Sequence, residues 1–220
     1  MKYLAPGLWR LDELPRPLIN VYVAEDVLID AGRRWDSRRI AKQIEGLSLS
    51  MLALTHVHPD HQGCAKEICD GRGIPLACHE ADVDAMDGRR PVAATAAPIA
   101  KFFGGLWQGP PRAVDRVLRE GDEVAGFRVV HAPGHAPGEV IFFREQDRVA
   151  ICGDVVRNIS YLSMRTKLAE PPDDLTPDPN ENRRSIRKLA ALEPALILPG
   201  HGPAVTDMIS FNRFVAALPG

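Results

Sequence analysis

The segment Thr55-His56-Val57-His58-Pro59-Asp60-His61-Gln62-Gly63 places three of the chain's seven histidines within six residues. It follows a dense apolar run at residues 49–54, which is typical of a buried strand. Side chains two positions apart on a helix point about 200° apart, so a helix would keep His56 and His58 from binding one metal ion. Pro59 also disfavours the helical region for the residue before it. We therefore expect a loop that leaves the end of a strand and turns into a helix.

Two further histidines share a second local pattern. A strand predicted at residues 127–131 is followed by Pro133-Gly134-His135, and one predicted at 195–198 by Pro199-Gly200-His201. Glycine tolerates positive φ and lets the backbone approach a bound ion, so this tripeptide suits a ligand loop. A fourth predicted strand ends in Gly153-Asp154. Four strand ends thus carry the candidate ligands His56, His58, Asp60, His61, His135, Asp154 and His201.

Short apolar runs alternate along the chain with amphipathic stretches. Helical spacing predicts helices over residues 37–45, 61–70, 183–192 and 206–217. Strands and helices interleave throughout, which indicates an α/β or α+β class. The chain has 220 residues, no clear repeat and no linker long enough to divide it, so we expect one domain over residues 1–220.

The composition argues against several kinds of partner. Lysine and arginine number 27 against 29 aspartate and glutamate, and a net charge of −2 offers no excess for a nucleic-acid backbone. No apolar stretch reaches the ~18 residues that a membrane helix needs. The N-terminus has no continuous apolar segment of signal-peptide type. We expect a cytoplasmic protein that acts on a small molecule and binds neither nucleic acid nor membrane; a homo-oligomer is possible.

Taken together, these motifs resemble those of the metallo-β-lactamase superfamily. The matching stretches are THVHPDHQG for the HxHxDH motif, PGH at 133–135, GD at 153–154 and PGHG at 199–202, with VLIDAG at 27–32 as the early strand motif. The metal motif is like that of glyoxalase II. The resemblance implies a four-layered αββα sandwich with a metal cleft at one edge of its two sheets.

The resemblance also implies a dinuclear metal site. One divalent ion would be bound by His56, His58 and His135, and a second by Asp60, His61 and His201, with Asp154 bridging the pair; Asp60 and Asp154 would also be catalytic. Imidazole and carboxylate ligands suit zinc, iron and manganese, and we expect two zinc ions. Asp30 is expected to orient a ligand histidine.

The implied activity is hydrolysis. A hydroxide shared by two metal ions would attack a carbonyl carbon in a thioester, another ester or a lactone. The β-lactam-cleaving members lack the bridging aspartate, whereas this chain has Asp154. Two alternatives remain open: a persulfide dioxygenase with one iron on His56, His135 and Asp154, and a non-catalytic metal-binding protein.

Three aromatic residues are candidate substrate contacts. Tyr161 resembles in placement a tyrosine of superfamily lactonases, while Phe103 and Trp107 belong to an apolar cluster within residues 87–111. That segment and residues 157–180 are predicted to be irregular, as lids and binding loops often are. His79 and His131, which stand outside the motifs, are expected to be capping or packing residues.

Overall fold

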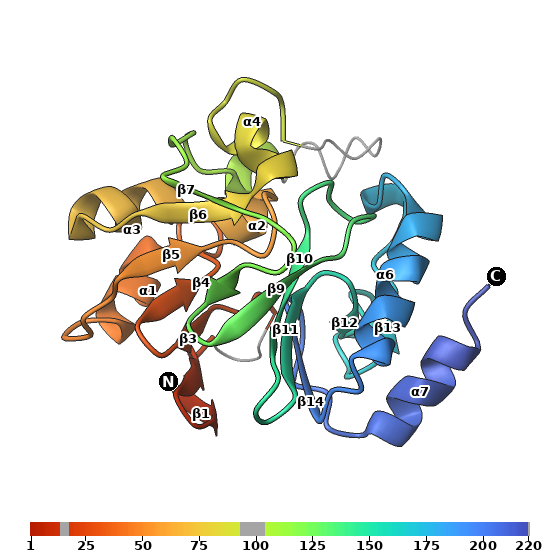
Figure 1. Ribbon diagram of the computed structural model, residues 1–220. Helices are drawn as coiled ribbons and strands as arrows, with labels where there is room; N and C mark the ends of the chain where they lie inside the picture. The colour runs from red at the N-terminus through yellow and green to blue at the C-terminus, as the bar shows by residue number, and fades with distance from the viewer. Residues whose placement is uncertain (14–17, 93–103, 220) are drawn as a thin grey trace.

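Two β-sheets lie face to face between two layers of helices in the computed structural model, which describes residues 1–13, 18–92 and 104–219 (Figure 1). The helices α1 (Ser37–Gln43) and α3 (Ala65–Arg72) cover one sheet, and α6 (Pro179–Ala191) and α7 (Met208–Ala216) cover the other. The predicted four-layered αββα sandwich of the α/β class is confirmed.

The first sheet follows the order of the chain. Its strands are β1 (Lys2–Ala5), β2 (Leu8–Arg10), β3 (Tyr22–Ala24), β4 (Val27–Ile29), β5 (Met51–Ala53), β6 (Leu76–His79) and β7 (Arg116–Leu118). Pairing is antiparallel from β1 to β4 and parallel from β4 to β7. Parallel neighbours need crossovers, which α1 provides between β4 and β5 and α3 between β5 and β6.

The second sheet has the order β14-β11-β10-β9-β8. Its strands are β8 (Glu123–Val124), β9 (Phe127–His131), β10 (Val140–Arg144), β11 (Val149–Gly153) and β14 (Leu196–Pro199). All pairs are antiparallel except β11 with β14, which α6 connects. A small third sheet joins β12 (Arg157–Asn158) to β13 (Leu168–Ala169), ahead of the 3-10 turn η2 (Asp173–Leu175).

Alternation along the strands builds three separate apolar cores. Val27 and Ile29 face the second sheet, whereas Leu28 between them faces the helices. On β10, Phe142 points to the first sheet and Phe143 to α6 and α7. A strand that is apolar on both faces belongs inside a sandwich, and each such side chain stabilises the fold by about 1.5–3 kcal/mol.

The four cysteines are free and buried in the outer two cores. Cys64, Cys69 and Cys78 lie between the first sheet and its helices. Cys152 lies between the second sheet and its helices. None of these thiols is a candidate ligand.

One predicted helix is wrong in detail. Residues 61–70 do not form a single helix, because α2 (Pro59–Gln62) stops before α3 starts. His58 is extended at φ −119° and ψ 159° and forms the N-cap, with Pro59 in the first helical turn. The interruption spans Gly63 and Cys64, whose amides donate to the carbonyl oxygens of Gly32 and Ala31, and the backbone leaves the helical region at Cys64 (φ −102°, ψ 4°). The loop expected after the strand at 49–54 is present.

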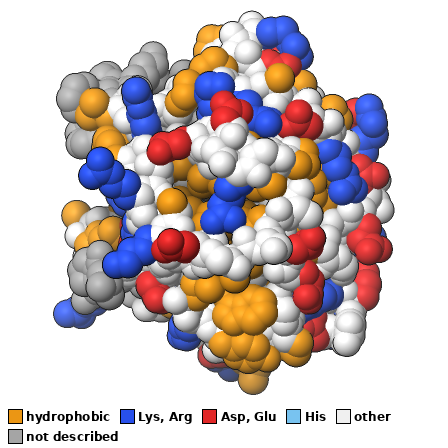
Figure 2. Space-filling view, turned by 90° about the vertical axis from the view of Figure 1, so that its left-hand side faces the viewer, with side chains coloured by type: hydrophobic (Ala, Val, Ile, Leu, Met, Phe, Trp, Pro, Cys, Tyr) orange, Lys and Arg blue, Asp and Glu red, His pale blue; other side chains and the backbone are white. Residues whose placement is uncertain are grey.

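Charges are mixed over the surface. Figure 2 shows basic and acidic side chains interspersed on one face, with a hydrophobic cluster near its lower edge. Among the described residues, no helix is long and apolar enough to cross a membrane.

Candidate metal centre

Four strand ends meet at one edge of the sandwich. β9, β11 and β14 run in the same direction, so the loops after them emerge together. β5 of the first sheet delivers its loop to the same place, where the Val140 amide donates to the Thr55 carbonyl oxygen at 2.9 Å. The Gly200 amide donates to the Gly153 carbonyl oxygen at 2.6 Å. The candidate ligand loops are thereby tied together by backbone hydrogen bonds.

Three histidines form the first candidate ligand group. His56 Nε2 lies 3.1 Å from His58 Nδ1, which lies 3.0 Å from His135 Nε2. All three side chains are buried, with exposed fractions of 0%, 7% and 4%. Three nitrogens at these separations surround one point, as tetrahedral metal coordination requires.

The second group combines Asp60, His61 and His201, and Asp154 lies between the two groups. Asp154 Oδ2 is 3.0 Å from His201 Nε2 and 3.4 Å from His135 Nε2, while Oδ1 is 3.5 Å from His61 Nε2. His201 Nε2 is also 3.4 Å from Asp60 Oδ2. Asp154 therefore contacts a member of each group, as a bridging ligand would.

Hydrogen bonds to the outer ring nitrogens fix which nitrogen faces inward. His56 Nδ1 lies 3.1 Å from Thr55 Oγ1, and that hydroxyl donates to the Asp30 carboxylate. His135 Nδ1 lies 3.3 Å from Thr176 Oγ1, whose hydroxyl donates to the Pro172 carbonyl oxygen. Because each hydroxyl uses its own proton elsewhere, each histidine donates its Nδ1 proton and keeps an Nε2 lone pair.

The second group is oriented in the same manner. His61 Nδ1 lies 2.9 Å from Asp30 Oδ2, and His201 Nδ1 lies 2.6 Å from the Leu18 carbonyl oxygen. Asp30 adopts φ 64°, a strained conformation for a non-glycine residue, and holds its carboxylate against His61. Asp30 is therefore placed to orient His61, and the role of His61 as a metal ligand stays a prediction. Buried Asn20 supports the last loop by donating to the carbonyl oxygens of Pro199 and Gly202.

The chemistry of these residues fits divalent cations. His56 Nε2 and His135 Nε2 both present lone pairs to His58 Nδ1 at 3.0–3.1 Å, and that nitrogen can donate a proton to only one of them. A cation among the three nitrogens would satisfy all of them. His61 Nε2 and Asp154 Oδ1 are buried without a hydrogen-bond partner among the described residues. Unsatisfied buried polar atoms are costly, and a bound metal ion would remove that cost.

The electrostatics of the two groups differ. Burial lowers the pKa of His58 to about 3 and of His135 to about 4, so both are neutral and able to ligate at pH 7. Burial would also lower the pKa of His61 and His201, but the carboxylates beside them raise it well above the usual value. Negative charge thus concentrates around His61 and His201, where a divalent cation would be stabilised.

The three predicted substrate residues have different surroundings. Tyr161 lies beside the metal centre, with its ring centroid 5.7 Å from that of His201. Trp107 packs edge-on against Trp35 at 6.5 Å, and the Arg33 guanidinium lies over its ring. Phe103 lies outside the described residues.

Sequence reasoning missed two buried carboxylates next to the centre. Glu139 is fully buried, and its Oε1 lies 3.5 Å from His56 Nδ1. Asp82 is 2% exposed and accepts from the backbone amide of Val57. A sequence signal existed for Glu139, which directly precedes the buried run Val140–Arg144.

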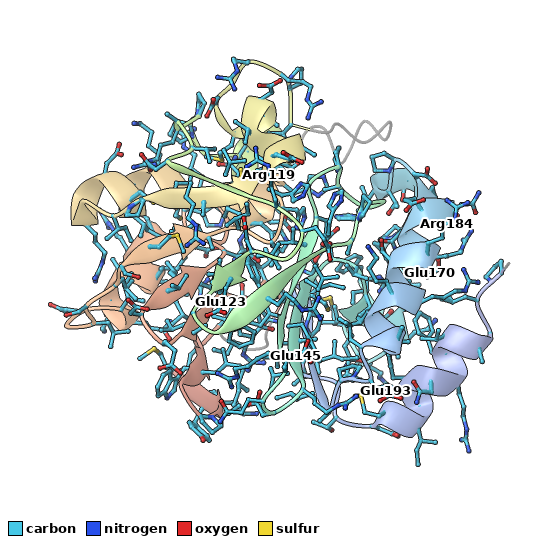
Figure 3. All side chains as sticks on the ribbon, in the orientation of Figure 1. Arg119, Glu123, Glu145, Glu170, Arg184 and Glu193 are labelled. Carbon is cyan, nitrogen blue, oxygen red and sulfur yellow. The ribbon has the colours of Figure 1, made fainter. Side chains whose placement is uncertain are left out.

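His79 and His131 form a separate pair. Their rings stack at 4.0 Å with 12° between planes, and His79 Nδ1 accepts from the Ala81 amide as an N-cap. Glu80, Glu120 and Arg119, which is labelled in Figure 3, are the charged groups that act on His79. The predicted capping and packing roles are confirmed.

We expect His79→Asn to leave metal content unchanged and to flatten the acid end of the stability profile. Burial, then His131, lower the pKa of His79 from 6.5 to about 4. The unfolded chain takes up this proton below about pH 6.5 and the folded protein does not, so wild type loses stability as pH falls toward 4. Urea unfolding of metal-free protein at about pH 7.5 and about pH 5 measures the difference. Loss of a metal ion from His79→Asn would contradict the capping and packing role of His79.

Known proteins resemble this chain over most of its length. The profile of the Metallo-beta-lactamase superfamily matches residues 16–201. The probable metallo-hydrolase YflN of Bacillus subtilis is 30% identical over 207 residues, 82% of this chain and 76% of that protein. The metallo-beta-lactamase family protein TTHA1429 from Thermus thermophilus has a TM-score of 0.69 and 25% identity, covering 97% of this chain and 80% of that one. TTHA1623, solved in a di-iron-bound form, has a TM-score of 0.68 and 27% identity, covering 98% of both chains.

Proposed function

We propose that this chain, which belongs to the metallo-beta-lactamase superfamily, hydrolyses a thioester, another carboxylic ester or a lactone. This superfamily consists of metal-dependent proteins, and the curated relatives of this chain include probable metallo-hydrolases. The observation that carries the proposal is the convergence of seven buried or half-buried histidine and aspartate side chains, whose candidate ligand atoms lie close together.

Each of the seven residues then has a role in a dinuclear centre. His56, His58 and His135 would hold one ion, and Asp60, His61 and His201 the other, with Asp154 shared. Two bound divalent ions would lower the pKa of a shared water toward ~7 and stabilise negative charge on a carbonyl oxygen. Zinc is our first expectation, and iron is supported by the di-iron form of TTHA1623; manganese also suits these ligands.

The chain's own side chains complete the chemistry. Burial would raise the pKa of Asp60, but His201 and His61 lower it, so Asp60 is ionised and offers an anionic oxygen that can bind a cation or accept a hydrogen bond from a water beside it. Burial of its hydroxyl raises the pKa of Tyr161 to about 12, although the residue as a whole is 43% exposed. Tyr161 therefore keeps its proton at neutral pH and can donate it in a hydrogen bond to the substrate carbonyl.

We expect dialysis against a chelator to abolish hydrolysis and zinc to restore it. The assay is a panel of p-nitrophenyl esters, acyl thioesters and lactones, with elemental analysis of each sample. About two ions per chain with restored turnover would support the proposal. One iron per chain with oxygen uptake on a persulfide would favour a dioxygenase instead. Metal-loaded protein that is inactive across the panel and on the persulfide would indicate a non-catalytic metal-binding protein.

A further inference from the structure

Two buried carboxylates beside the metal centre have no role as ligands. Asp82 is 2% exposed and Glu139 is fully buried. Among the described residues, neither forms an ion pair with a lysine or an arginine, and the only basic side chain within 4 Å of Glu139 is that of His56. Burying a carboxylate is costly unless hydrogen bonds compensate it, so the partners of these two groups indicate what they do.

Asp82 joins two of the ligand loops. It lies in the 3-10 turn η1 (Glu80–Asp82) after β6, and its Oδ2 accepts from the Val57 amide at 2.9 Å. Its Oδ1 accepts from the Gly138 amide at 3.0 Å. Val57 stands between His56 and His58, while Gly138 follows His135 by three positions. One carboxylate thereby sets the distance between loops that come from different sheets.

Glu139 joins the second loop to a third. Its Oε1 accepts from the Asp154 amide at 2.5 Å and lies 3.5 Å from His56 Nδ1. Asp154 follows β11, so this contact links the candidate bridging ligand to the loop that carries His135. Both contacts are far from the solvent, where water cannot compete for the hydrogen bonds.

A glycine packs tightly against each of the two carboxylates. A Cβ added at Gly138 would lie 2.5 Å from Asp82 Cγ. A Cβ added at Gly153 would lie 2.6 Å from Glu139 Oε1 and 2.8 Å from Thr55 Cβ. Any residue larger than glycine at these two positions would collide with the carboxylate, so both contacts require the glycines.

We propose that Asp82 and Glu139 are positioning residues that lock the three loops carrying His56, His58, His135 and Asp154 before metal binds. The inference rests on the proposed metal centre but not on the identity of the substrate. Four candidate ligands on three loops would otherwise have to be ordered by the metal ion, which weakens its apparent affinity. Outer-shell partners of metal ligands contribute about 10- to 100-fold to affinity, and we expect an effect of that size here.

The test measures zinc affinity of metal-free protein by competition with a chromophoric chelator. Asp82→Asn keeps the size of the side chain, but its amide can accept from only one of the two backbone amides. We expect zinc to bind about 10- to 100-fold more weakly. The absorption spectrum of cobalt-loaded protein should change as well, because it reports ligand geometry and not only folding.

Asp87→Asn is the matched control. Asp87 also accepts a backbone hydrogen bond across the chain, from the Val114 amide at 3.0 Å, but it touches no ligand loop. We expect unchanged zinc affinity in this variant. Wild-type affinity and an unchanged cobalt spectrum in folded Asp82→Asn would overturn the proposal. Wild-type protein that binds no zinc, cobalt or iron would instead refute the proposed function.

If Asp82→Asn does not fold, two substitutions at Glu139 test the positioning role instead. Glu139→Gln keeps an oxygen that accepts from the Asp154 amide, so zinc affinity should stay near the wild-type value. Glu139→Leu removes the acceptor, and we expect binding about 10-fold weaker or more. Equal loss in both variants, or loss in neither, would contradict a positioning role.

Discussion

Replacing Asp154 with alanine is expected to lower kcat/KM by more than about 100-fold and to reduce the metal content of the purified protein. Asp154 is the carboxylate whose oxygens approach His61, His135 and His201 within 3.5 Å. Loss of an outer-shell partner alone costs about 10- to 100-fold, so loss of a shared ligand should cost more. Kinetics on the best substrate of the ester and thioester panel, with elemental analysis, measures both effects.

Asp147→Ala is the control for this substitution. Asp147 lies in the hairpin between β10 and β11 and pairs with Arg144, whose Nη2 is 2.7 Å from Asp147 Oδ2. This substitution also removes an aspartate carboxylate, but Asp147 contacts no candidate ligand, so turnover should be retained. Full activity and full metal content in Asp154→Ala would show that this residue does not bridge the two groups.

Replacing Gly200 with alanine is expected to be nearly as damaging. An added Cβ would lie 2.3 Å from Asp154 Oδ1 and 2.7 Å from His61 Cε1, closer than any real contact. One of these ligands must then move, since the loop itself is held through Pro199 by Asn20 and Tyr22. We expect loss of metal from the Asp60, His61 and His201 group, and at least about a 100-fold loss of kcat/KM.

Gly71→Ala provides the comparison. Gly71 lies in α3 with no atom within 4 Å of an added Cβ, and alanine favours a helix over glycine by about 1 kcal/mol. This variant should keep its metal and activity and unfold at slightly higher temperature. If Gly200→Ala behaved like Gly71→Ala, the packing of the last ligand loop against Asp154 would be contradicted.

Much of the metal centre could be predicted because its signals are local. Pro59 after His58 fixes an extended backbone, and Pro-Gly before His135 and His201 marks the end of a strand. The structure brings these residues together, and their roles as ligands stay a prediction that metal analysis must test. Tyr161 was placed by resemblance, and its ring lies against His201.

The supporting contacts could not be predicted, because they depend on distant parts of the chain. Asp82 reaches Val57 over 25 positions and Gly138 over 56. No local pattern distinguishes it from Asp84 or Asp87, which are more exposed. The break between α2 and α3 was missed for a similar reason, since the amides of Gly63 and Cys64 bind the distant carbonyl oxygens of Gly32 and Ala31.

The four buried thiols can report which outer layer of the protein opens. Burial raises the pKa of Cys64 and Cys69 to about 12 and that of Cys152 well above its usual value. Alkylating reagents attack the thiolate, so each sulfur stays inert until its layer separates. Cys152 reports on one side of the sandwich and the other three cysteines on the opposite side. Their order of modification therefore records which outer layer detaches first.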